Sequence, residues 1–279
     1  MTPPTGASTS TNKGLGSTMG LQFRWIRRAS DVHALARTAA DEVQRLSHEA
    51  ISERGVFRVA LAGGSTPRTL YEVLAMSTTA RFDRWHFYWG DERFVPPDHQ
   101  DSNFLMSQQT LLGRLAISHH QIHRIRTEIG TPSQVAADYE DELKYSFNLG
   151  KHELPRFDLV LLGLGNDGHT ASLFPGTAAL DERERLVVAN WVEEQQSHRI
   201  TMTLPVINAA RAVIFTVSGE GKADVLQKVL DDRSNAETLP ARQVCPTDGT
   251  VLWVVDDAAA EPREADEDIP RDSMALPSN

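Results

Sequence analysis

The sequence has almost no cysteine and no long apolar run. Cys245 is the only cysteine among 279 residues, so no disulfide can form within the chain, and no CxxC or Cys/His cluster near it suggests zinc. No stretch of about 18 apolar residues occurs, which argues against a membrane-spanning helix. The first residues also lack the apolar core of a secretory signal. These absences predict a soluble, cytoplasmic protein with no membrane partner.

The sequence also lacks an excess of basic residues. Its formal net charge is −10, and residues 256–272 hold eight acidic side chains against two basic ones. We therefore expect no nucleic-acid partner and no obligate protein partner. Residues 1–20 are rich in Ser, Thr, Gly and Pro and are predicted to be a disordered extension, and residues 257–279 an acidic disordered tail. Residues 21–256 are predicted to form a single α/β domain.

Short apolar runs alternate with segments of helical periodicity. Strands are expected at 56–62, 85–89, 157–162, 212–217 and 251–255, and helical patterns follow or precede them at 32–46, 70–74, 104–115, 136–147 and 226–230. This alternation predicts a doubly wound, mostly parallel sheet with helices on both faces. Because such folds bind ligands beyond the carboxyl ends of their strands, the segments 63–68, 90–93 and 163–169 are the candidate site.

The first of these segments reads GGSTP over residues 63–67 and lies between a strand and a helix. Its glycines let backbone N–H groups approach an anion, and Pro67 suits the first helical position. The segment therefore predicts a phosphate-binding turn, although a plain tight turn with a helix cap explains it equally well. It is not a serine-nucleophile elbow, because Pro67 replaces the last glycine of that motif.

The third segment reads GLGNDGH over residues 163–169 and matches the glycine pattern of dinucleotide-binding proteins. We reject that interpretation because Pro175 and Gly176 interrupt the long helix that such a site needs. A histidine at this strand end can instead act as a general base, with Asp167 fixing its tautomer. The alternative is that His169 merely caps the following turn.

Several charged residues complete the candidate site. Asp91 and Arg93 end the second strand and can serve sugar hydroxyls and a phosphate. Arg199 and Lys222 are further candidate cations, although each can be an ordinary surface charge. Lys222 is followed by Ala223 and so is not part of a Walker A loop. Three histidines at positions 119, 120 and 123 have ligand-like spacing but no carboxylate at a metalloprotease offset, so no metal and no cofactor are expected.

The three strand-end motifs together resemble the 6-phosphogluconolactonases, a family related to the glucosamine-6-phosphate deaminases and sharing their Rossmann-like sheet. The matching stretches are ALAGGSTP at 60–67, WGDER at 89–93 with SNFL at 102–105, LGLGNDGHTASLFP at 162–175, RITMT at 199–203, and Lys222. The resemblance covers roughly residues 23–256. The deaminases share Asp-Gly-His, but the ASLFPG that follows it and Asp-Glu-Arg after the second strand resemble the lactonase branch.

The resemblance implies hydrolysis of 6-phospho-D-glucono-1,5-lactone to 6-phospho-D-gluconate in the oxidative pentose phosphate pathway, without a metal or cofactor. His169 is then the expected base and Asp167 its supporting carboxylate. Asp91 either binds sugar hydroxyls or assists proton transfer to the ring oxygen. The substrate and its phosphate are expected to meet Gly63, Gly64, Ser65, Thr66, Arg93, Asn103, Arg199 and Lys222. A non-catalytic sugar-phosphate regulator built on the same sheet stays an alternative.

Overall fold

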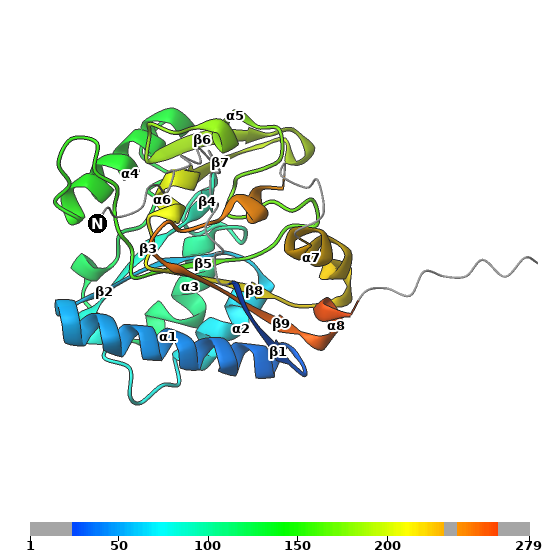
Figure 1. Ribbon diagram of the computed structural model, residues 1–279. Helices are drawn as coiled ribbons and strands as arrows, with labels where there is room; N and C mark the ends of the chain where they lie inside the picture. The colour runs from blue at the N-terminus through cyan, green and yellow to red at the C-terminus, as the bar shows by residue number, and fades with distance from the viewer. Residues whose placement is uncertain (1–23, 232–238, 262–279) are drawn as a thin grey trace, which may run out of the picture.

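A six-stranded parallel sheet forms the centre of the molecule (Figure 1). The computed structural model describes residues 24–231 and 239–261. The strand order is β1-β9-β8-β5-β2-β3, and every neighbouring pair is parallel. The strands are β1 (Arg24–Ala29), β2 (Phe57–Leu61), β3 (Trp85–Trp89), β5 (Leu159–Leu162), β8 (Ala212–Val217) and β9 (Thr250–Asp256). The predicted doubly wound parallel sheet is confirmed.

Helices cover both faces of this sheet. They are α1 (Val32–Arg54), α2 (Ser65–Leu74), α3 (Asn103–Thr110), α4 (Pro132–Ser146), α5 (Ala178–Asp181), α6 (Leu204–Asn208), α7 (Ala223–Leu230) and α8 (Asp257–Ala260). Short 3-10 turns occur at η1 (Phe82–Arg84), η2 (Leu112–Arg114), η3 (His119–Gln121), η4 (Glu193–Gln195), η5 (Glu220–Lys222) and η7 (Pro240–Gln243). Helices α1 and α2 lie side by side on one face, and α4 and α6 lie on the other (Figure 1).

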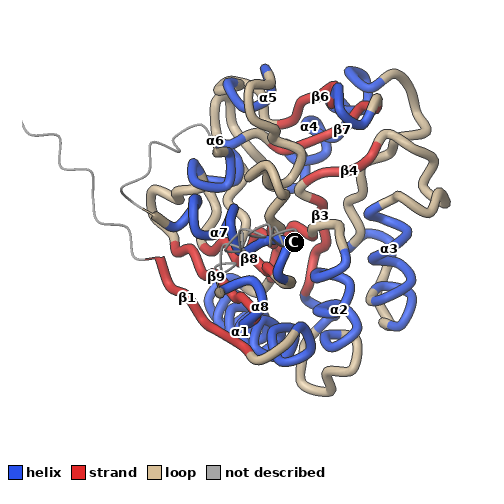
Figure 2. Tube along the Cα trace, turned by 90° about the vertical axis from the view of Figure 1, so that its right-hand side faces the viewer, coloured by secondary structure: helices blue, strands red, loops and turns tan. Residues whose placement is uncertain are grey.

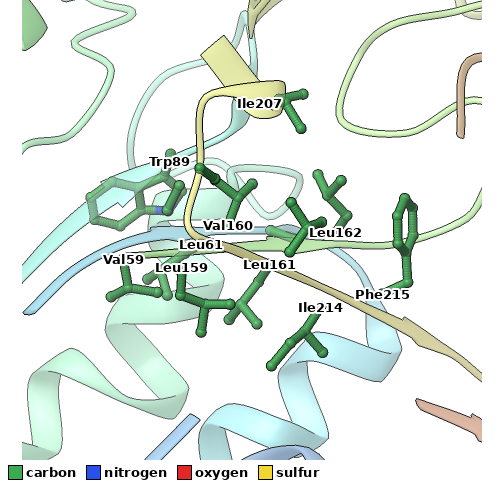
Figure 3. Close-up of a cluster of buried hydrophobic side chains, with 14 of the residues drawn as sticks. Val59, Leu61, Trp89, Leu159, Val160, Leu161, Leu162, Ile207, Ile214 and Phe215 are labelled. Carbon is green, nitrogen blue, oxygen red and sulfur yellow. The ribbon is translucent and has the colours of Figure 1, made fainter. Parts of the chain in front are cut away.

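The core lies on both sides of the central strands because they are buried on both faces. All four residues of β5 are buried, as a strand with helices above and below requires. Leu159 and Leu161 project to one side of the sheet, whereas Val160 projects toward Ile207 of α6 (Figure 3). Further along, Phe215 stacks on Trp253 with ring centroids 3.8 Å apart. The continuous apolar runs seen in the sequence are thus the inner strands.

A second, antiparallel sheet was not expected from the sequence. It has the order β4-β7-β6, with β4 (Asp91–Arg93), β6 (Val187–Val192) and β7 (Ser197–Met202), and it stands beyond the carboxyl end of β3 (Figure 2). β4 has only three residues, all charged, and the first half of β7 is polar. Neither segment shows the apolar pattern by which a strand is predicted, although Asp91 and Glu92 are buried. Both segments pair with a neighbouring strand, which keeps them extended.

The chain ends differ from expectation at one point. The acidic tail was predicted to begin at residue 257, but Asp256 accepts a hydrogen bond from the Ala259 N–H and caps the short helix α8. That carboxylate also accepts from the Gly219 N–H, at 3.0 Å. Asp256 lies inside the predicted domain, and the first residues of the predicted tail, 257–260, form the helix that it caps. The predicted extension 1–20 and the tail beyond residue 261 lie outside the described residues.

Two buried tyrosines fasten the strand ends that lead into the candidate site. The Tyr71 hydroxyl of α2 donates to the Ala62 carbonyl and accepts from the Ala62 N–H, both at 2.9 Å. The Tyr139 hydroxyl of α4 makes the same pair of bonds to Trp89, at 3.0 and 2.9 Å. Burial raises the pKa of both phenols, so they stay neutral donors. Each hydroxyl thus links a helix to the end of a strand, just before the segment that enters the candidate site.

Replacing Tyr71 with phenylalanine should lower the free energy of unfolding by about 1–3 kcal/mol, because it leaves two buried backbone groups without a partner. Urea denaturation monitored by tryptophan fluorescence measures the change. Tyr145→Phe is the matched control, since Tyr145 lies on α4 and is 86% exposed, and it should change stability by less than about 0.5 kcal/mol. Equal effects of the two substitutions would contradict this role of Tyr71.

Within the described ranges, no helix combines the length and the apolar character that crossing a membrane requires.

Candidate active site

One cavity of about 290 Å³ opens at the carboxyl ends of the parallel strands, between them and the antiparallel sheet. Ten of the residues predicted for the site line it, namely Gly63, Gly64, Ser65, Thr66, Asp91, Arg93, Asn103, His169, Arg199 and Lys222. Asp167 does not line the cavity and lies behind His169, with which it forms a hydrogen bond. The structure therefore brings the three predicted strand ends together at one place.

His169 and Asp167 form a hydrogen-bonded pair. The Nδ1 atom of His169 lies 2.5 Å from Oδ1 of Asp167, and the His169 backbone N–H donates to the same oxygen at 3.1 Å. A carboxylate only accepts, so in the neutral ring Nδ1 carries the proton and Nε2 keeps its lone pair. Burial raises the pKa of Asp167, but the bonds from His169 outweigh burial and hold it below its ordinary value.

The imidazole is also held between a glycine and an aromatic ring. A Cβ atom on Gly165 would lie 2.0 Å from Nδ1 of His169 and 2.6 Å from Oδ1 of Asp167, so no other residue fits there without moving the pair. The ring also stacks on Phe174, with centroids 4.1 Å apart. Gly165 of the glycine pattern is thus needed because the backbone passes close beside the His169 ring.

Asp91 is buried beside the histidine loop. Its Oδ2 accepts a hydrogen bond from the Ser172 hydroxyl at 2.6 Å, and its Oδ1 accepts from the Asn103 amide at 3.3 Å. The same amide donates to the Asp91 backbone carbonyl at 2.9 Å. Asp91 is therefore an acceptor fixed from two sides at the floor of the cavity.

Glu92 points away from the cavity, because neighbouring residues of a strand face opposite sides. Its carboxylate accepts from the backbone N–H groups of Arg93, Asn103 and Phe104 and from the Ser102 hydroxyl, and so caps the start of α3. Burial raises the pKa of Glu92, and these backbone bonds oppose the rise only in part. Of the two acids in this motif, only Asp91 reaches the substrate space.

The start of α2 forms another wall of the cavity. Gly64 has a φ of +110° and precedes the helix, with no side chain capping its N–H groups. Thr66 shares a hydrogen bond of 2.8 Å with Ser218, which follows β8 and also lines the cavity. Exposed N–H groups and the positive end of the helix dipole favour an anion at this position.

Two arginines face each other on adjacent strands at the rim. Arg93 of β4 and Arg199 of β7 are paired in the antiparallel register. Among the described residues neither guanidinium forms an ion pair; Arg93 donates to the Asp101 carbonyl at 2.6 Å and Arg199 to the Gln195 side chain. Burial, and next the charge of Arg93, lowers the pKa of Arg199. The carboxylates of Asp91, Glu92 and Asp101 oppose this shift but form no ion pair with Arg199 among the described residues. Two like charges held together in this way favour an anionic ligand.

Lys222 supplies a third cation from the segment after β8. Its Nζ donates to the Asn166 side chain at 2.6 Å, beside Asp167. Burial lowers the pKa of the Lys222 ammonium, and the charge of Asp167 opposes that shift. Lys222 therefore lies beside the segment 163–169 that carries His169, and its charge is accessible to a phosphate in the cavity.

Sequence reasoning missed several residues that line the cavity. Ser172, Gln195 and Ser218 line the cavity and were not selected. Ser218 could have been found, because it follows a buried strand at its carboxyl end. No signal identified Gln195, which lies in the turn between β6 and β7. The histidines at 120 and 123 do not form a metal cluster, since no suitable group of three ligands exists within the part of the chain described.

Comparison with known proteins agrees with this geometry. Residues 30–253 match the family model described as glucosamine-6-phosphate isomerases/6-phosphogluconolactonase. The 6-phosphogluconolactonase of Nostoc sp. is 42% identical over 229 residues, which are 82% of this chain and 94% of the relative. The human 6-phosphogluconolactonase is 40% identical over 232 residues, covering 81% of this chain and 87% of the relative.

Solved structures give the same answer. The 6-phosphogluconolactonase from Trypanosoma cruzi superposes with a TM-score of 0.78 at 29% identity, covering 85% of this chain and 96% of that protein. The enzyme from Trypanosoma brucei also gives 0.78 at 29% identity, covering 86% and 98%. The family match over residues 30–253 includes all three strand-end motifs. This chain belongs to the glucosamine-6-phosphate isomerase/6-phosphogluconolactonase family.

Proposed function

We propose that this protein hydrolyses 6-phospho-D-glucono-1,5-lactone to 6-phospho-D-gluconate, the lactonase step of the oxidative pentose phosphate pathway, in the cytoplasm. The observation that carries the proposal is that His169, paired with Asp167, lines a cavity together with cations that form no ion pair among the described residues. A general base and an anion-binding site in the same cavity are what the hydrolysis of a phosphorylated ester requires. The curated relatives at about 40% identity carry the name of this activity.

In the first step, Nε2 of His169 takes a proton from a water molecule as the water oxygen attacks C1 of the lactone. Asp167 accepts the Nδ1–H bond throughout and stabilises the imidazolium that forms. The carbonyl π bond becomes an oxyanion on a tetrahedral carbon. Attack by water leaves no covalent bond between enzyme and substrate.

In the second step, the oxyanion re-forms the carbonyl and the bond between C1 and the ring oxygen breaks. The proton on Nε2 passes to the departing ring oxygen, which becomes a hydroxyl group, and His169 returns to its neutral form. The new carboxylic acid loses its proton to solvent. Water adds across one ester bond, and no electrons are exchanged with a cofactor.

The phosphate is seated at the start of α2. Gly64, Ser65 and Thr66 line the cavity at this helix start, whose N–H groups have no side-chain cap, and Arg199 and Lys222 line it from β7 and from the segment after β8. Arg93 adds a further charge beside Arg199. Seating the phosphate fixes the lactone carbonyl relative to His169, which lowers the entropic barrier to attack.

The proposal is tested by adding the purified full-length protein to freshly generated 6-phosphogluconolactone, with a chelator present, and following acid release against spontaneous ring opening. We expect rapid turnover that the chelator does not slow. No acceleration over the spontaneous rate would reject the lactonase and favour a sugar-phosphate regulator. Release of ammonia from glucosamine 6-phosphate under the same conditions would point to the other branch of the family.

Removing the charge of Arg199 or Lys222, the cations proposed to bind the phosphate, should raise KM while kcat changes little. Arg199→Ala and Lys222→Ala each remove a charge-assisted hydrogen bond, which corresponds to an increase in KM of about 10- to 100-fold. Steady-state kinetics on the lactone measure both constants. Arg37→Ala, an exposed arginine of α1, is the control and should match wild type. An unchanged KM for Arg199→Ala or Lys222→Ala would remove that residue from the phosphate seat.

A further inference from the structure

Ser172 is a buried residue of the cavity to which the chemistry above gives no role. It is 1% exposed, and Asp91, which accepts its hydroxyl hydrogen bond at 2.6 Å, is 7% exposed. A short hydrogen bond to a buried carboxylate fixes the orientation of that carboxylate and is among the stronger side-chain bonds. The residue that holds Asp91 thus comes from the same loop as His169.

Ser172 is itself held by the antiparallel sheet. Its N–H donates to the Thr201 hydroxyl of β7 at 3.3 Å, and its carbonyl accepts from the Asn190 amide of β6 at 3.0 Å. The preceding residue, Ala171, has a φ of +48°, in the left-handed region that costs a side-chain-bearing residue about 1 kcal/mol or more. The fold thus maintains a strained backbone that turns the serine toward Asp91.

Asn103 adds a second acceptor beside Asp91. Its amide nitrogen is used by Asp91, while its Oδ1 atom is buried and has no partner among the described residues. A Cβ atom on Gly63 would lie 1.8 Å from that oxygen, so the glycine leaves it room. A buried acceptor without a donor is costly. Because Asn103 lines the cavity, a ligand hydroxyl could supply the missing donor.

We propose that Ser172 is a positioning residue that fixes the Asp91 carboxylate, next to Oδ1 of Asn103, as a two-acceptor seat for hydroxyl groups of the sugar ring. This inference rests on the proposed lactonase function and assigns Asp91 to hydroxyl binding rather than to proton transfer. The Asp91 carboxylate already accepts from Ser172 and Asn103, and Oδ1 of Asn103 has no protein donor among the described residues. The lone pairs that remain on these acceptors therefore select a ring that carries hydroxyls. A lactone without the matching hydroxyl leaves a buried acceptor unpaired.

The test compares four substrates, namely 6-phosphogluconolactone and its three analogues that lack the hydroxyl at C2, C3 or C4. Wild type and Ser172→Ala are assayed on each. Ser172→Ala should lower kcat/KM for the full lactone by about 10- to 100-fold, mainly through KM. For the analogue that lacks the hydroxyl bound by Asp91, wild type should already show the loss in kcat/KM, and Ser172→Ala should lower it further by no more than about twofold.

Ser107→Ala is the matched control, because Ser107 is also fully buried and donates to a backbone carbonyl within α3, at 2.9 Å from Phe104. It should match wild type on all four lactones. Asp91→Asn keeps the size of the side chain and provides a second route should Ser172→Ala not fold. It should lose discrimination for the same hydroxyl.

Three results separate the possible failures. An equal penalty of Ser172→Ala and of Asp91→Asn on all four lactones would overturn the inference while leaving the lactonase intact. Ser172→Ala kinetics identical to those of Ser107→Ala would also overturn it. Failure of wild type to hydrolyse even the full lactone would instead reject the proposed function.

Discussion

His169→Ala is expected to lower kcat for lactone hydrolysis by about 10²- to 10⁴-fold, with KM within a few-fold of wild type. The substitution removes the group that we propose takes the water proton and later returns it to the ring oxygen, whereas the proposed phosphate contacts lie on α2, β7 and the segment after β8. Initial rates above spontaneous opening measure the change.

The control for this substitution is His33→Ala, since His33 is an exposed histidine of α1 and should leave both constants unchanged. A folded His169→Ala protein with near-normal kcat would show that another group activates the water. In that case the hydrogen bond between His169 and Asp167 would have only a structural role.

Gly165→Ala is expected to lower kcat by about 100-fold or more, although it alters no group that reacts. Its Cβ would lie 2.0 Å from Nδ1 and 2.3 Å from Cε1 of His169, so the ring must leave its place beside Asp167. A shift of about 1 Å in a catalytic group suffices for a loss of this size. Steady-state kinetics and the melting temperature should be measured together, because the loss should appear in a folded protein.

Gly221→Ala is the matched control, since a Cβ there meets nothing within 4 Å and Gly221 is not among the glycines with positive φ. It should keep wild-type kcat and a similar melting temperature. Wild-type turnover in Gly165→Ala would contradict the close packing of the imidazole against the backbone at residue 165.

The sequence was informative where one segment carries both the element and the chemistry. His169 and Asp167 are two residues apart, so their hydrogen bond could be anticipated from a strand end followed by glycines. The proposed phosphate-binding turn at 63–67 is likewise contained in one short segment between a strand and a helix. The parallel sheet was predictable because its inner strands are buried on both faces and read as continuous apolar runs.

The features that could not be predicted depend on contacts between segments that are distant in the sequence. Ser172 and Asp91 are 81 residues apart, and only the pairing of β4 with β7 brings the loop and the strand together. β1 reads RWIRRA and was missed because it is an edge strand whose residues are mostly exposed. β4 was read as a strand end rather than as part of a new sheet. Composition and periodicity do not encode such pairings.

The most direct test of the account measures binding and turnover in one preparation of His169→Ala. Titration calorimetry with 6-phosphogluconate reports the phosphate and hydroxyl seats, and ³¹P NMR of lactone decay reports the chemistry. We predict a product affinity within a few-fold of wild type together with decay close to the spontaneous rate. Lactone decay as fast as with wild type would contradict the role of His169 as the base. Loss of both product binding and turnover would contradict the claim that the substrate is bound by groups other than His169.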